Sequence, residues 1–394
     1  MCNTVDKLAE IQYIRRMKIK RLLESPISRH LDQSNKGVII YGPRQAGKTT
    51  LVNDILAQKS WKVLVLNGDR RGQWWETLVS RDLARIKILL GGYDAIFIDE
   101  AQRIPEIGLI LKIILDEFKN LKVIATGSSS LDLASKVSEP LTGRAVTYTL
   151  YPISIAELAQ THTANELNES LESRLVFGSY PEIFSLDGQI AQSDYLRNLT
   201  NAYLYKDLLE FSGIKNSSKV HDLLKLLSFQ VGSQVSLSEL GGSLGIGKDT
   251  VGRYIDLLEK SFVIFRRSGF SRNLRKEVSK MDKIYFYDLG VRNTLIGNLN
   301  LLDNRDDGGK LWENFLMIER MKKQEYKQSL YSHYYWRLTS GAELDLVEEM
   351  NGKLTGFEFK FSKKSTRTPK SWLEQYVDSK FEVISRTNWQ EFVI

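Results

Sequence analysis

The segment GPRQAGKT at 42–49 constrains the fold of this chain more than any other feature of its sequence. It fits the pattern G-x-x-x-x-G-K-[ST] without substitution. The preceding KGVIIYG is a short β-branched apolar run, as in a buried parallel strand, and the following TTLVNDILAQ repeats Leu51, Ile55 and Leu56 at helical spacing. The sequence therefore predicts a strand, a phosphate-binding loop and a helix, in that order.

The residue types of this loop indicate how it would hold phosphates. Its glycines let successive backbone N–H groups and the helix N-terminus face negative charge. Lys48 is expected to reach the β and γ phosphates, and the Thr49 hydroxyl to bind Mg²⁺. We therefore expect ATP and Mg²⁺ as cofactors. The residues expected to bind the nucleotide are Gly42, Pro43, Arg44, Gln45, Ala46, Gly47, Lys48, Thr49 and Thr50.

A second apolar strand, in YDAIFIDEAQRIP at 93–105, ends in two carboxylates. Asp99 fits the Walker-B aspartate that supports Mg²⁺. Glu100 stands where an ATPase places the group that orients and deprotonates the attacking water. The alternative interpretation is a strand that stops at a solvated acidic turn.

Composition excludes several classes of protein. The 394 residues suffice for two or three domains, and 42% hydrophobic and 26% charged residues are an ordinary globular balance. No apolar run approaches the roughly 18 residues of a membrane span, and the charged N-terminal segment does not resemble a secretory signal. Cys2 is the only cysteine, so neither an intrachain disulfide nor a cysteine-based zinc site is expected. We expect a soluble, cytoplasmic protein.

Seven segments carry a resemblance to a known family. They are YGPRQAGKTTL, IFIDEAQRIP, ATGSSSLDLASKVSEPLTGR, YPISIAEL, GSYPEIF, YLYKDLLE and KIYFYDLGVRN. Their order resembles a prokaryotic family of AAA+-type ATPases that join a P-loop core to a winged helix and a restriction-endonuclease-like C-terminal domain of the PD-(D/E)XK type. The resemblance implies an α/β fold with a parallel sheet. The domains expected are an ATPase core at 1–150, a helical lid at 151–215, a winged helix at 216–292 and an endonuclease-like domain at 293–394.

Two further residues are candidates for work on the phosphates. In AAA+ enzymes a polar residue at the end of the strand in LKVIATGSSSLDL contacts the γ-phosphate or the water, and here Ser128 is the first candidate and Thr126 the second. Arg144 follows a glycine on an expected loop, where its guanidinium could stabilise transition-state charge in the site of a neighbouring subunit. The alternative for Arg144 is a surface ion pair.

The segment at 218–290 reads as helix, glycine turn and helix, followed by two strands. This is the pattern of a winged helix-turn-helix. Its basic residues would position a nucleic-acid duplex through phosphate contacts. The alternative is a protein–protein or intersubunit module whose basic residues are solvated. The candidate DNA-binding residues are Lys248, Arg253, Arg266, Arg267, Arg272, Arg275 and Lys276.

The C-terminal segment predicts a β-hairpin, since the turn Asn351-Gly352 separates AELDLVEEM from KLTGFEFKFS. Period-two alternation would put Glu343, Asp345 and Val347 on one face of the first strand. The second strand would place its acidic and basic residues on one face and its phenylalanines on the other.

These strands are similar to the PD-(D/E)XK nuclease core. In such a site two carboxylates hold Mg²⁺ and a lysine helps to activate water against a phosphodiester. Asp345, Glu358 and Lys360 would take these roles, and Glu313 on the preceding helix could be a further ligand. The alternative is a nuclease-like fold kept for binding or assembly, with its charges paired to one another.

Three functions are compatible with these features. The first is a DNA-dependent ATPase that forms a ring oligomer, possibly a hexamer, and translocates on or remodels DNA. The second is an ATP-gated, Mg²⁺-dependent nuclease in defence against foreign DNA. The third is a nucleotide switch that acts through a protein partner.

Overall fold

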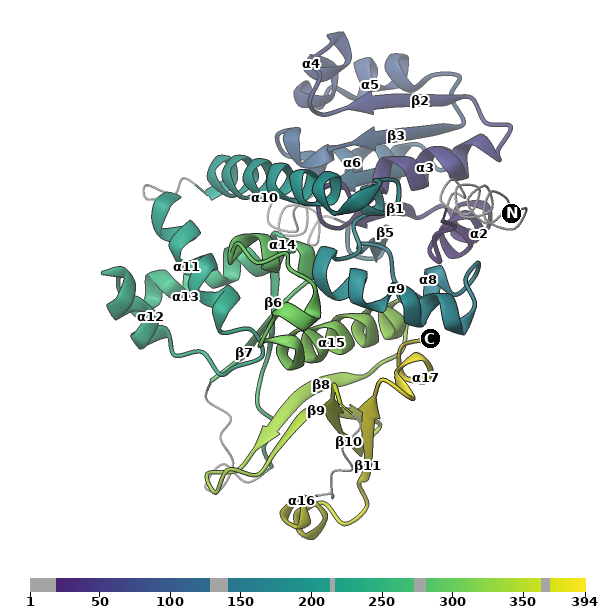
Figure 1. Ribbon diagram of the computed structural model, residues 1–394. Helices are drawn as coiled ribbons and strands as arrows, with labels where there is room; N and C mark the ends of the chain where they lie inside the picture. Colours follow the sequence, from purple (N-terminus) through teal and green to yellow (C-terminus); the bar gives the residue numbers. More distant parts are fainter. Residues whose placement is uncertain (1–18, 128–140, 213–216, 273–280, 363–368) are drawn as a thin grey trace, which may run out of the picture. The chain divides into compact units, whose positions relative to one another are not determined.

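The computed structural model describes residues 19–127, 141–212, 217–272, 281–362 and 369–394 (Figure 1). The chain divides into two compact units. The core unit consists of residues 20–152 and 260–262, and the C-terminal unit of residues 153–259 and 263–394 with Ile19. The division into four domains stays a prediction.

The core unit is built on a sheet of five parallel strands in the order β2-β3-β4-β1-β5. The strands are β1 (Gly37–Tyr41), β2 (Val63–Asn67), β3 (Ala95–Asp99), β4 (Lys122–Gly127) and β5 (Ala145–Thr149). β1 is buried along its whole length because β4 and β5 pair with it on either side. The predicted α/β class with a parallel sheet is confirmed, and the loop after β1 leaves from the interior of the sheet.

The helices of the core unit follow the apolar periodicity of the sequence. They are α2 (Glu24–Gln33), α3 (Lys48–Ala57), α4 (Gln73–Ser80), α5 (Leu83–Leu90), the 3₁₀ turn η1 (Ala101–Arg103) and α6 (Ile107–Glu117). α6 contains the most apolar run and buries Ile107, Ile110, Leu111 and Ile114 at spacings of three and four residues. In the part of the chain that the structure describes, no helix is both long and apolar enough to cross a membrane.

The C-terminal unit begins with helices that are held together by GSYPEIF and KIYFYDLGVRN, two of the segments that carry the family resemblance. The helices are α8 (Ile155–Leu158), α9 (Ala164–Phe177), the 3₁₀ turn η2 (Pro181–Phe184), α10 (Gly188–Ser212) and α14 (Leu289–Leu295). Asp288 caps α14 by accepting from the Val291 N–H, and it also accepts from the Ser179 N–H at 2.7 Å. A Cβ at Gly178 would lie 2.1 Å from the Asp288 carboxylate, so only glycine fits there. GSYPEIF and KIYFYDLGVRN therefore have a structural role.

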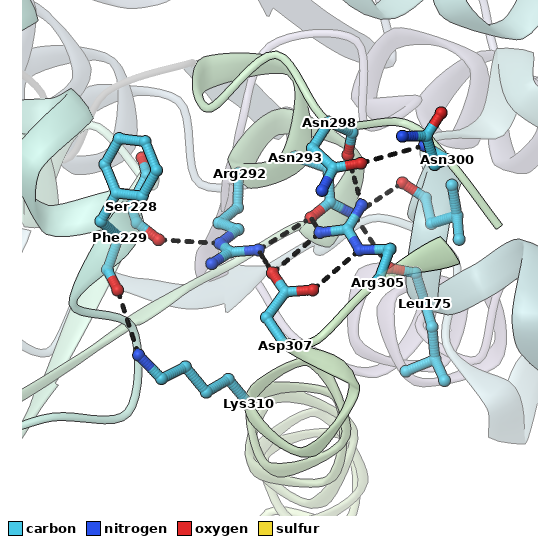
Figure 2. A network of polar contacts seen from close by, with 11 residues as sticks. Leu175, Ser228, Phe229, Arg292, Asn293, Asn298, Asn300, Arg305, Asp307 and Lys310 are labelled. Atoms are coloured by element: carbon cyan, nitrogen blue, oxygen red, sulfur yellow. Dashed lines mark hydrogen bonds and ion pairs between the residues drawn. The ribbon is translucent and has the colours of Figure 1, made fainter. Parts of the chain in front are cut away.

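A buried network of polar contacts follows α14 (Figure 2). Arg292 and Arg305 both donate to Asp307, the residue before α15 (Gly308–Tyr326). Arg292 also donates to the carbonyl of Ser228 on α11 (Ser217–Phe229), at 2.8 Å. Burial raises the pKa of Asp307, but the hydrogen bonds from the two guanidinium groups outweigh it and lower the pKa to about 2. The network ties α11, α14 and α15 into one body.

The segment expected to be a winged helix has the predicted elements in the predicted order. After α11 come α12 (Leu237–Leu244), α13 (Lys248–Lys260) and the antiparallel strands β6 (Ile264–Arg267) and β7 (Lys283–Phe286). The segment that follows β6 makes further backbone hydrogen bonds, to a strand outside the hairpin. The Phe270 N–H donates to the Tyr335 carbonyl at 2.6 Å, and the Tyr335 N–H donates to the Ser268 carbonyl. The hairpin and the terminal sheet are separate sheets, and an isolated bridge between Gly269 and Tyr335 links them.

The terminal sheet has four strands in the order β11-β10-β9-β8. They are β8 (Ser332–Arg337), β9 (Glu343–Met350), β10 (Lys353–Lys360) and β11 (Lys380–Ser385), with η3 (Leu302–Asn304), α16 (Lys370–Gln375) and α17 (Trp389–Val393) as the remaining elements. The predicted hairpin is confirmed, because β9 and β10 pair antiparallel across Asn351 and Gly352, which both have positive φ. Buried residues of α15, including Phe315, pack on Phe357 and Phe359 of β10.

The predicted alternation along β9 is wrong. The register between β8 and β9 shifts between Tyr334 and Trp336. As a result Leu344 and Val347, three residues apart, pack in the same apolar cluster around Trp372. A bulge of this kind puts an extra residue into one strand, so Glu343, Asp345 and Val347 do not share one regular face.

Candidate active site

The loop after β1 needs its glycines for two different reasons. Gly42 has a φ of 147°, and a Cβ there would lie 2.0 Å from the carbonyl oxygen of Leu150, which follows β5. Gly47 precedes α3 in the left-handed region, at φ 94°. Gln45 also has a positive φ, 59°. The backbone therefore curls tightly before the helix begins, as the sequence pattern predicts.

The predicted nucleotide-binding residues lie together on this loop and the first turn of α3. Lys48 is 5% exposed, and its ammonium donates to the carbonyls of Gly42 and Pro43, each at 2.9 Å. Thr49 and Thr50 are exposed at the start of α3. Pro43 and Ala46 are buried, Arg44 is half-buried and Gln45 is exposed. A helix N-terminus with exposed hydroxyls beside a buried ammonium suits a phosphate group.

Asp99 joins three strands and a helix at the carboxyl ends of the sheet. The Thr49 hydroxyl on α3 lies 3.0 Å from Asp99 Oδ1, and the Thr126 hydroxyl on β4 lies 2.5 Å from the same atom. The Asn67 amide on β2 donates to Asp99 Oδ2 at 3.4 Å. The structure thus places Thr126, the second candidate, at this site. Ser128, the first candidate, lies outside the described residues.

Glu100 follows Asp99 with a strained backbone. Its φ of 50° and ψ of 43° lie in the left-handed region, which costs a glutamate of order 1–3 kcal/mol. Its N–H donates to the Thr126 hydroxyl at 3.3 Å, and its carboxylate accepts from Gln102 Nε2 at 2.6 Å. The predicted base therefore lies next to the predicted Mg²⁺ ligand.

Sequence reasoning missed Arg21, which is 8% exposed. Its guanidinium donates to the carbonyl of Ala46 in the loop and to the carbonyl of Tyr151 after β5, both at 2.6 Å. It fixes the two segments that approach each other at Gly42. An arginine this far upstream gives no local signal, because its partners are backbone carbonyls that any sequence supplies.

Arg144 lies at the opposite end of the sheet from the loop. Its carbonyl accepts from the N–H of Gly37, the first residue of β1, whereas the loop follows the last. Its guanidinium donates to Asp116 at 2.7 Å, and both side chains are more than a third exposed. The structure therefore does not bring Arg144 to the loop of its own chain.

The predicted nuclease residues do come together in the C-terminal unit. Burial raises the pKa of Asp345 well above its ordinary value, and the neighbouring carboxylates Glu313 and Glu358 raise it further. Asp345 accepts from the Phe359 N–H at 2.7 Å, and Glu358 pairs with Lys360 at 2.5 Å. Within the described ranges, however, no group of three or more Asp, Glu, His or Cys side chains is placed to hold a metal ion.

A lysine that sequence reasoning did not assign to this cluster compensates its charge. Lys283 on β7 has a 4% exposed side chain and lies 2.6 Å from Glu343 Oε1 and 3.3 Å from Glu313 Oε1. Burial lowers its pKa, but the attraction of Glu313, Glu343 and Asp345 outweighs this and raises it. Its ammonium thus stays charged among the carboxylates. This arrangement agrees with the alternative to a nuclease site, in which the charges of the cluster pair with one another.

The candidate DNA-binding residues differ in their surroundings. Lys248 and Arg253 are exposed on α13. Arg266 pairs with Asp256 and Glu259, and Arg272 pairs with Glu349. The remaining described candidate, Arg267, lies over the Phe265 ring and donates to Met321. Arg275 and Lys276 lie outside the described residues.

Three family models match successive parts of this chain. Residues 34–159 match the family model described as an AAA domain. Residues 168–302 and 308–391 match two domains of unknown function, DUF8612 and DUF4143. The AAA match and the geometry around the loop define the core unit as a P-loop ATPase domain of the AAA type.

The chain is also similar to whole proteins. An uncharacterised protein of Mycobacterium tuberculosis is 29% identical over 328 residues, which cover 82% of this chain and 70% of that protein. An uncharacterised protein of Methanocaldococcus jannaschii is 25% identical over 410 residues, which cover 92% and 84%. Among solved structures, the Walker-type ATPase of Pyrococcus abyssi has a TM-score of 0.47 at 16% identity, covering 71% of this chain and 96% of that chain.

Replacing Lys283 with methionine tests the charge compensation. The variant leaves Glu313 and Glu343 without their buried cation, so the free energy of unfolding should fall by about 3 kcal/mol or more. Urea unfolding at pH 7 measures it. The matched control is Lys310→Met on the same helix as Glu313, because Lys310 is exposed and donates to a backbone carbonyl. Equal effects of the two variants would contradict the assignment.

Stability should also depend on pH through Asp345. Its pKa is higher in the folded than in the unfolded chain, so this group stabilises the fold at low pH and loses that contribution as pH rises above about 4. Asp345→Asn removes the titration. The free energy of unfolding of this variant, minus that of wild type, should therefore increase between pH 5 and pH 8. Urea unfolding at each pH measures this difference. Asp378→Asn, at an exposed position, should show no such trend; a flat difference for Asp345→Asn would refute the expectation.

Proposed function

We propose that the core unit binds ATP and hydrolyses it with Mg²⁺. The observation that carries the proposal is the hydrogen-bonded set of Thr49, Asp99 and Thr126, with Glu100 beside it. Parallel strands present their carboxyl ends at one edge of a sheet, where open α/β folds bind ligands. The set therefore stands beside the phosphate loop, as phosphoryl transfer requires.

The donor set fits a magnesium ion. Mg²⁺ prefers oxygen ligands, and the Thr49 hydroxyl and the Asp99 carboxylate would hold it. When bound, it would neutralise charge on the phosphates. Lys48 would move from the loop carbonyls to the phosphates. Glu100 would orient the attacking water and take its proton, and the Thr126 hydroxyl would hold the backbone of Glu100 in place.

We further propose that hydrolysis is coupled to DNA and takes place in a ring oligomer. The exposed Lys248 and Arg253 on α13 support a phosphate-contacting face, which the paired Arg266 and Arg272 do not extend. Arg144 is remote from the loop of its own chain, so a role in catalysis requires a neighbouring subunit. Its ion pair with Asp116 is solvent-exposed, and such pairs exchange partners at little cost.

The nuclease alternative has less support from the C-terminal cluster. A cation site needs carboxylates that are available to the ion, whereas Glu313 and Glu343 are already paired with Lys283. The pairing of Arg266 and Arg272 with carboxylates weakens the DNA-coupled function relative to the third function, a nucleotide switch that acts through a protein partner. Dependence on DNA distinguishes this switch from the DNA-coupled ATPase.

The first test is ATP hydrolysis by wild type and two variants. Glu100→Gln should reduce kcat by about 100-fold or more because it removes the base, and should retain ATP binding. Lys48→Ala should lose binding as well. Glu117→Gln, at an exposed acidic residue of α6, is the control and should behave as wild type. Unchanged hydrolysis in Glu100→Gln would exclude this site as its source.

The second test adds duplex, single-stranded or branched DNA at low and moderate salt. One form of DNA should stimulate hydrolysis, and the double variant Lys248→Glu/Arg253→Glu should lose the stimulation without losing basal activity. Removing two phosphate contacts should also make the plot of log binding constant against log salt concentration less steep, by a slope of about 2. The control Arg85→Glu/Lys87→Glu reverses two exposed charges on α5. Absence of stimulation at low salt would favour the nucleotide switch.

A further inference from the structure

The backbone of Glu100 is held in its strained conformation from several sides. The Glu100 N–H donates to the Thr126 hydroxyl, and the Glu100 carbonyl accepts from the Arg103 N–H at 3.0 Å. Gly68 approaches so closely that a Cβ there would lie 2.3 Å from the Glu100 carbonyl oxygen. A conformation that costs free energy and is enforced by its surroundings indicates a functional constraint on where the side chain points.

The side chain of Glu100 has a partner of its own. Gln102, on the 3₁₀ turn η1, is 5% exposed, and its Nε2 lies 2.6 Å from Glu100 Oε2. The amide is neutral and therefore donates to the carboxylate at every working pH. One carboxylate oxygen is thereby oriented by Gln102, and Oε1 is the oxygen left to face a water molecule.

We propose that Gln102 is a positioning residue for hydrolysis, which aims the Glu100 carboxylate at the attacking water. The inference rests on the proposed ATPase function and deepens it. Gln102 does not touch substrate in this role. It limits the rotation of Glu100 and so keeps the base within reach of the proton, and a displacement of about 1 Å at such a group costs about 100-fold in rate.

The chemistry of the pair explains why glutamine is suited to the position. A leucine would fill similar space but would leave Glu100 without a donor. A glutamate would put a second carboxylate about where the amide is, so that an acceptor would face an acceptor. Both substitutions therefore remove the donor to Glu100, one with an apolar side chain and one with an acceptor.

The experiment measures kcat, KM for ATP and thermal unfolding for wild type, Gln102→Leu and Gln102→Glu. Gln102→Leu should lower kcat tenfold or more, with KM changed less than about twofold, because the phosphate loop is untouched. Gln102→Glu keeps the size of the side chain but replaces the donor with an acceptor, so it should also lower kcat, again with KM changed less than about twofold. A residue that only supports the fold would lower the midpoint of thermal unfolding without this selective loss of kcat.

The matched control is Gln58, an exposed glutamine whose Nε2 donates to Glu24 at 3.0 Å. Gln58→Leu and Gln58→Glu should leave both kcat and KM unchanged. Wild-type kcat in the Gln102 variants, or a rise in KM matching the fall in kcat/KM, would overturn the positioning role. Hydrolysis that is absent from wild type, or that persists in Glu100→Gln, would instead refute the proposed function itself.

Discussion

The carboxylate of Asp99 is the acceptor on which the geometry of the core unit depends. Hydroxyls from α3 and β4 and an amide from β2 all donate to it. These elements meet because the strand order places β3 between β2 and β4, with all strands parallel. A single buried charge thus sets the relative positions of the helix that follows the phosphate loop and the strands that carry the residues around the water. Hydrogen bonds to a charged group are stronger than neutral ones, which suits this ordering role.

The C-terminal unit uses buried charge in another way. Asp307 pairs with Arg292 and Arg305, and Lys283 pairs with two of the carboxylates around Asp345. Buried ion pairs contribute little to stability relative to apolar packing, but they permit few alternative arrangements once their desolvation has been compensated. The unit therefore derives its stability from the apolar residues of α15 and β10, and its polar networks fix which segments lie together.

The sequence predicts the phosphate loop and the Asp99–Glu100 pair well because each is a local pattern whose neighbours in the chain are its neighbours in space. It fails where the partner is distant. Arg21 binds backbone carbonyls that carry no residue-specific signal, and Lys283 lies among acids that are 30 and 60 residues further along the chain. The alternation through Asp345 fails because a bulge depends on the pairing with β8, which period-two reasoning does not include.

The position of Lys283 has a consequence for dividing the chain. A fragment that starts at residue 293, where sequence patterning would begin the terminal domain, keeps Glu313, Glu343 and Asp345 but leaves their cation behind. It also leaves behind Ser268 and Phe270, which pair with Tyr335, and so bares the outer edge of β8. Such a fragment would carry an uncompensated buried acid cluster and an open strand edge prone to self-association. A fragment that includes the hairpin from β6 onward would keep both the cation and the cover of this strand edge.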